Sequence, residues 1–118
     1  SLNTIDYAEV GLKESTMEKV EFKTGATREA KSLPRYDLIP PEGLRRLGNR
    51  YLLGSTKYAP KNWEKGMPYS VVYNHLVKHL LAWQSGDELD DHLAAVAWGA
   101  FSLMHYEKHN NDMDDIHG

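Results

Sequence analysis

Cysteine is absent from the 118 residues of the chain. This absence excludes a disulfide framework and a zinc site built from thiolates, and it fits a reducing compartment. Long apolar runs are missing as well, so the sequence predicts no membrane span and no signal peptide. An excess of positive charge is also lacking. The formal net charge is −3, which gives no reason to expect binding to a nucleic-acid duplex.

The residues that are present suit one compact domain with a modest core, since hydrophobic residues make up 41 % of the chain. The first part differs from the rest, because residues 1–33 are polar with scattered apolar positions and no sustained period. We predict an extended N-terminal arm there, with a short strand at Met17–Phe22. A disordered tail is the alternative, because so polar a segment buries little surface by itself.

Two helices are predicted before the third in a helical domain that covers residues 34–109. Pro41 suits the first turn of a helix, and leucines and a tyrosine recur at helical spacing from there to a stop near Gly54. Ser70 is the expected N-cap of the second helix, which ends at Ser85-Gly86. The inward stripe of this second helix is predicted to contain Val72, His75, Leu76, His79, Leu80 and Trp83.

A third helix follows the acidic stretch Asp87–Asp91 and continues to about Glu107. Its small residues, Ala94, Ala95, Ala97, Gly99 and Ala100, permit close approach of a neighbouring helix. Residues 110–118 form an acidic tail that is expected to fray. The sequence therefore predicts an all-α protein with a three-helix core. Since three helices make a thin core, we also expect a homodimer or higher oligomer.

One group of polar residues has the composition of a metal site. His75 and His79 are four residues apart and share one helix face, and the next helix begins with acidic residues and another histidine. Imidazoles with carboxylates suit a divalent transition metal, whereas sets made of carboxylates alone favour magnesium or manganese. The alternative is that the histidines only pack and that the acidic residues only complement the helix dipole. The group contains His75, His79, Glu88, Asp90, Asp91 and His92.

A second group lies in the loop KYAPKNWEKG, residues 57–66. Lysines and backbone amides can hold phosphates, and Trp63 offers a flat surface for a base. Asn62 has both a donor and an acceptor for a base edge. The alternative is a solvated loop in which Trp63 folds inward and the lysines stay in water.

The order of four motifs resembles a known family. These motifs are GATREA, RYDLIPPEGL, GSTKYAPKNWEKGMP and HLVKHLLAWQSGDELDDHLAAVAWGAFSLMHYE. From about Gly25 to Glu107 the chain resembles the N-terminal domain of phage dATP/dGTP diphosphohydrolases, which are grouped with MazG-like proteins. The resemblance implies a helical, metal-dependent pyrophosphohydrolase, encoded by a phage and working in the host cytoplasm. It would convert purine deoxynucleoside triphosphates to monophosphate and pyrophosphate, with magnesium or manganese as cofactor.

The resemblance also implies roles for individual residues. Arg35, Lys61 and Lys65 would hold phosphates, while Asn62 and Trp63 would shape the nucleotide pocket. The metal would be bound by His79, Asp90, Asp91 and His92. The general base would be Asp91 or Glu88.

The chain departs from the MazG pattern at one place. MazG-type enzymes place E-x-x-E on one helix and E-x-x-D on the next, whereas this chain has His75-x-x-x-His79 and then Asp90 and Asp91. A module that binds a nucleotide or a nucleotide signal without catalysis is therefore a second hypothesis, and a structural or interaction protein is a third. The first two require that the Trp63 loop and the imidazole–carboxylate group meet at one cleft.

Overall fold

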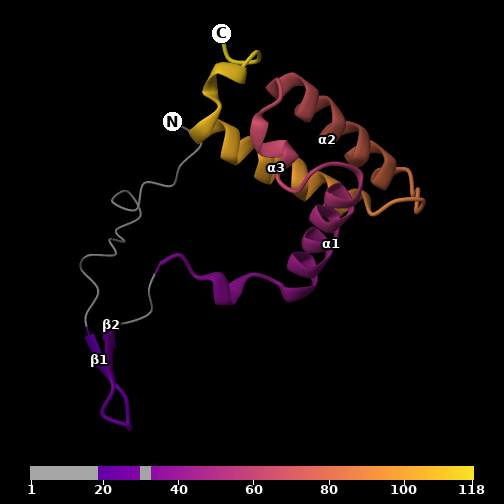
Figure 1. Cartoon of the computed structure of the whole chain (residues 1–118). Coiled ribbons are helices and arrows are strands. Elements are labelled where there is room, and N and C mark those ends of the chain that lie inside the picture. Colours follow the sequence, from indigo (N-terminus) through magenta and orange to yellow (C-terminus); the bar gives the residue numbers. More distant parts are fainter. Residues whose placement is uncertain (1–18, 30–32) are drawn as a thin grey trace. The chain divides into compact units, whose positions relative to one another are not determined.

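The computed structural model describes residues 19–29 and 33–118 and divides into two units, Ser1–Ile39 and Pro40–Gly118 (Figure 1). Most of the predicted arm lies outside the described residues. The described part of the first unit contains a hairpin in which β1 (Lys19–Glu21) pairs antiparallel with β2 (Thr27–Glu29). β1 falls within the predicted strand, and β2 was not predicted.

The second unit contains three helices, as predicted, so the fold is mostly helical in the described residues. They are α1 (Pro41–Lys57), α2 (Tyr69–Gln84) and α3 (His92–His109). Two short 3-10 helices complete the unit, η3 (Asn62–Lys65) between α1 and α2 and η4 (Asn111–Met113) after α3 (Figure 1). No described helix has the length and apolar character needed to cross a membrane.

The end of α1 differs from the prediction. Pro41 opens the helix, where a missing N–H costs nothing. Gly54 does not end it, because its carbonyl accepts a hydrogen bond from the N–H of Tyr58 at 3.0 Å and the helix continues to Lys57. Pro60, which has no N–H to donate, follows soon afterwards. The helix is therefore nearly one turn longer than the predicted end near Gly54 implied.

The start of α2 is capped from outside the helix. Pro68 is the N-cap residue, and Ser70 lies in the first turn instead of serving as the cap. The carboxylate of Asp115 accepts hydrogen bonds from the backbone N–H of Ser70 at 2.8 Å and from its hydroxyl. The tail that was expected to fray is thus attached to the helical unit, and it places a negative charge at a helix N-terminus.

The core is small and lies near the start of α2 and the end of α3. Tyr69, Val72 and Tyr106 form its buried centre, and Trp63 and Met113 pack against them with Met67 and Leu103. This packing fixes η3 and η4 against α2 and α3, so the core supports the loop that carries Trp63.

The packing of α2 on α3 depends on one glycine. A Cβ at Gly99 would lie 3.1 Å from Cδ1 of Leu76. The close helix approach predicted from the small residues is therefore present at this position. The predicted inward stripe of α2 is only partly right, because Leu80 is 43 % exposed and Trp83 is 53 % exposed.

Candidate functional site

The basic-aromatic loop is an ordered turn held on α3. Lys61 begins it in the left-handed region with a φ of 62°. The hydroxyl of Tyr106 donates a hydrogen bond to the carbonyl of Trp63. The edge of the His105 ring also meets the Trp63 ring, with 4.8 Å between centroids. These contacts keep the Trp63 indole half-buried in a fixed position.

A pocket of about 590 Å³ lies beside this loop. The rings of four Tyr and Trp residues line it, Tyr51, Tyr58, Trp63 and Trp98. The Tyr51 ring centroid lies 5.9 Å from that of Trp63 and 6.5 Å from that of Trp98. Pockets of this size bind small ligands and cofactors, and aromatic faces are surfaces on which nucleobases stack. The shape and lining therefore suit a flat ring system.

Some of the residues predicted to bind the nucleotide are among the polar residues that line the pocket. Lys61 and Asn62 line it, together with Arg50 and His75. Lys65 is exposed and lies outside the lining. The predicted phosphate contact of Lys65 has no support from this pocket.

Arg35 belongs to the N-terminal unit, and its guanidinium is engaged there. Its Nε donates to Oδ1 of Asp37 at 2.7 Å, and an Nη donates to Oδ2 at 2.8 Å. The hydrogen bond from Arg35, together with the charge of Asp37, raises the pKa of the arginine even against desolvation. Its role as a phosphate ligand stays a prediction.

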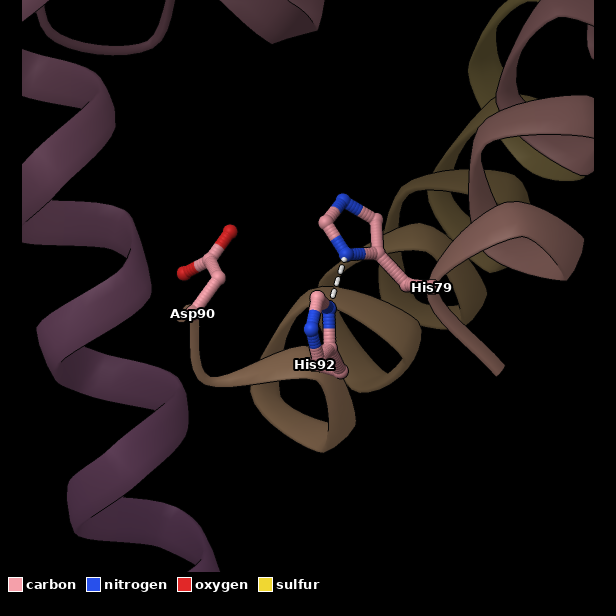
Figure 2. A group of neighbouring side chains, drawn as sticks. All are labelled: His79, Asp90 and His92. Carbon is pink, nitrogen blue, oxygen red and sulfur yellow. Dashed lines mark hydrogen bonds between the residues drawn. The ribbon is translucent and has the colours of Figure 1, made fainter. Parts of the chain in front are cut away.

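Two imidazoles and a carboxylate converge where α2, α3 and their connection meet (Figure 2). His79 comes from α2, His92 from the first turn of α3, and Asp90 from the segment just before it. Nδ1 of His79 lies 2.9 Å from Nδ1 of His92. One donor atom from each of the three residues lies within 4.8 Å of the other two, so the cluster could hold a metal ion.

The acidic residue Asp87 orients the ring of His92. Nε2 of His92 lies 2.5 Å from Oδ2 of Asp87, and a carboxylate only accepts, so Nε2 carries the proton. In the tautomer with its single proton on Nε2, His92 has a bare Nδ1 that can accept from Nδ1–H of His79. Histidines that bind metals are oriented by a carboxylate in the same way. The bond from His92 in turn lowers the pKa of Asp87.

His79 is held in its neutral form. Burial lowers its pKa first, and the positive charge of Arg50 and the neighbouring His75 lower it further. Neutral imidazole is the form with a lone pair for a ligand. The environment therefore suits His79 to the metal-binding role predicted for it.

Asp91 has a different place from the one predicted. Its two oxygens accept hydrogen bonds from Arg46 at 2.6 and 2.9 Å, and Oδ1 also accepts from the N–H of Ala94, which caps α3. The hydrogen bonds from Arg46 lower the pKa of Asp91 to about 2, although burial opposes them. Asp91 is not part of the His79–Asp90–His92 cluster. Its oxygens tie α1 to α3, which argues against both a metal-binding and a proton-accepting role.

Glu88 lies in another hollow, of about 340 Å³, at the connection between α2 and α3. Asp87, Asp90 and His92 also line this hollow, so Glu88 is near the cluster but outside the aromatic pocket. The side chain of Glu88 is exposed. Its role as general base stays a prediction.

Two residues connect the pocket with the cluster. Arg50 lines the pocket and donates from Nη1 to both oxygens of Asp90, at 2.8 and 3.0 Å. His75 also lines the pocket, and its ring centroid lies 5.1 Å from that of His79. The aromatic pocket and the cluster are therefore linked through Arg50 and His75, but His79, Asp90 and His92 do not line the pocket, so the single cleft that the nucleotide hypotheses required stays a prediction.

Sequence reasoning missed Arg50, Tyr51 and the role of Asp87. A signal for Arg50 was present, because Arg46 and Arg50 are four residues apart on one helix face and match the adjacent pair of acidic residues before α3. Tyr51 had no such signal, since a tyrosine at a helical apolar position is usually part of a core.

The fold and the site together define a small helical protein with a His–Asp–His cluster beside an aromatic pocket. Residues 23–116 match the family model described as dATP/dGTP diphosphohydrolase, N-terminal, and the chain belongs to this family. Comparisons with curated proteins and with solved structures gave no match.

Proposed function

We propose that this protein is a metal-dependent pyrophosphohydrolase of purine deoxynucleoside triphosphates, encoded by a phage and active in the host cytoplasm. The observation that carries the proposal is the position of Arg50. This cation belongs to the aromatic pocket and contacts the His79–Asp90–His92 cluster through Asp90. A base in the pocket would therefore direct its phosphates toward the cluster.

The donor set supports a transition metal better than magnesium. Two imidazole nitrogens and one carboxylate oxygen are available, and Mg²⁺ prefers an all-oxygen site. The orientation of His92 by Asp87 fits a metal ligand, because it leaves Nδ1 unprotonated. We therefore favour Mn²⁺ of the two predicted ions, bound by His79, Asp90 and His92.

Each residue of the site has a task under this proposal. Trp63 and Tyr51 offer aromatic surface on which the purine stacks, and Asn62 donates to or accepts from its edge. Arg50 and Lys61 bind phosphate oxygens. A bound divalent ion would neutralise phosphate charge and lower the pKa of the attacking water. Of the two predicted general bases we favour Glu88, because the oxygens of Asp91 already accept hydrogen bonds from Arg46 and Ala94.

The test is pyrophosphate release from dGTP and dATP with Mn²⁺ or Mg²⁺. We expect turnover with Mn²⁺, and we expect His92→Ala to reduce kcat by about a hundredfold or more because it removes a metal ligand. His117→Ala is the matched control, since His117 is an exposed histidine of the tail. Absence of pyrophosphate with both ions would overturn the enzymatic proposal.

Binding without catalysis is the second candidate, and one contact favours it. Arg50 already neutralises Asp90, so a metal would compete with that ion pair. Calorimetry with dGTP in the presence of EDTA separates the two functions. A binding module would take up the nucleotide without metal and return it unchanged, whereas the enzyme would require the metal for turnover.

A further inference from the structure

We propose that a second copy of this chain covers a face formed by α2 and α3 on the side away from α1. The face is defined by apolar residues at helical spacing on both helices. The residues from α2 are Tyr73, Val77, Leu80 and Leu81, and those from α3 are Val96, Ala97, Ala100, Phe101 and Met104.

The composition of α3 gives the first reason, because residues 93–104 of this helix are apolar on every side, apart from the buried Ser102. One side packs on α2, where Gly99 meets Leu76. Another meets α1, where Trp98 meets Tyr51. The third side carries Phe101, which is about half-exposed. A helix that is hydrophobic all round is normally buried, so this third side lacks a cover within the described residues.

The area of the face gives the second reason. Its five largest side chains are between 43 % and 57 % exposed. With roughly 200 Å² for each side chain of this size, together they expose about 500 Å². A standard dimer covers about 800 Å² on each partner, of which about two-thirds is apolar in homodimers. The face therefore supplies an apolar centre of the size that a stable dimer needs.

The shape of the face suits contact with itself. Ala97 and Ala100 form a low strip, and Phe101 and Met104 project beside it. In a two-fold contact the large side chains of one copy lie over the alanines of the other, which is the self-complementary arrangement that such symmetry requires. None of the nine residues is charged, so no unpaired charge would be buried.

The proposed contact would leave the pocket open. On α2 the pocket is lined by Val71 and His75, which lie on the opposite side of the helix from Tyr73 and Val77. Dimerisation is thus independent of the proposed enzymatic function, and a failure of either would not affect the other.

Sedimentation velocity of the full chain is the test. We expect a species of twice the chain mass of 13.5 kDa at micromolar concentration. Phe101→Asp should weaken association by about tenfold or more, because it buries a charge at the centre of the face. Leu52→Asp is the matched control, since Leu52 is a 63 % exposed leucine on α1, outside the face. A monomeric wild type, or a Phe101→Asp protein that dimerises as tightly as wild type, would overturn the proposal.

A second variant does not depend on tolerance of a buried charge. The chain has no cysteine, so Ala100→Cys introduces a single thiol at the proposed two-fold contact. A short bismaleimide cross-linker should join two copies through this thiol, whereas Leu52→Cys should stay largely monomeric on a denaturing gel. Equal cross-linking of the two variants would indicate random collision and contradict the proposed face.

Discussion

Arg50 binds Asp90 through two hydrogen bonds, from Nη1 to Oδ1 at 2.8 Å and to Oδ2 at 3.0 Å. This ion pair joins α1 to the segment that precedes α3, and it lies between the aromatic pocket and the two histidines. Burial opposes ionisation of Asp90, but the hydrogen bonds and charge of Arg50 bring its pKa below the usual value. Asp90 is therefore ionised. Its partner Arg50 is also the cation that would attract the phosphates of the proposed substrate.

Replacement of this arginine should separate metal binding from substrate binding. We expect Arg50→Gln to raise Mn²⁺ affinity several-fold, because Asp90 no longer has a competing cation, and to raise KM for the triphosphate. The free energy of unfolding should fall by about 1 kcal/mol or less, as for a partly exposed ion pair. Calorimetry with Mn²⁺ alone, steady-state kinetics and chemical denaturation measure these effects.

The control is Arg45→Gln, which removes an exposed ion pair with Glu42 and should leave Mn²⁺ affinity, KM and stability nearly unchanged. Unchanged or weaker Mn²⁺ binding in Arg50→Gln would contradict the competition.

Asp91 should prove to be a structural residue. Asp91→Ala removes the N-cap of α3 and the pair with Arg46, so we expect a loss of about 1–2 kcal/mol in the free energy of unfolding. Asp91→Asn keeps a capping oxygen and should lose less. Both variants should bind Mn²⁺ like the wild type. A large loss of metal affinity in Asp91→Asn, with stability intact, would restore Asp91 as a ligand.

Stability should fall in acid between about pH 4 and pH 2. The pKa of Asp91 is lowered from 3.8 to about 2 in the folded chain, so the unfolded state binds a proton first as the pH falls. The stabilisation from Asp91 is complete above its unfolded pKa and is lost as pH falls through the folded value. Asp87, Asp114 and Asp115 have lowered pKa values and act in the same direction. The free energy of unfolding, measured by denaturation at several pH values, should change less with pH in Asp91→Asn than in the wild type.

Two glycine-to-alanine substitutions should change the free energy of unfolding in opposite directions. At Gly99 the new Cβ would lie 3.1 Å from a Leu76 methyl, so α2 and α3 must separate slightly, and we expect a loss of about 1 kcal/mol or more. At Gly48, inside α1, nothing lies within 4 Å of the new Cβ. Alanine there should stabilise by about 0.5–1 kcal/mol because it favours the helix. Thermal melting of the two variants gives the comparison, and equal shifts would argue against tight packing at Gly99.

Periodicity and end signals were sufficient to predict the three helices. Pro41 and the Ser85-Gly86 pair are local signals, and a helix start or end depends mainly on its own turn. The tail was predicted wrongly for the opposite reason. Asp115 caps α2 from 45 residues away along the chain, and no local pattern reports a contact of that range.

The sequence by itself determined the helical class, the family resemblance and the residue types of the site, because these follow from short-range spacing and motif order. Only the tertiary structure decided which acidic residue faces the histidines. Asp90 and Asp91 are neighbours in the chain, yet one belongs to the His79–Asp90–His92 cluster and the other caps α3. Adjacent residues at a helix start point in different directions, and the side that each one meets depends on how α1, α2 and α3 pack.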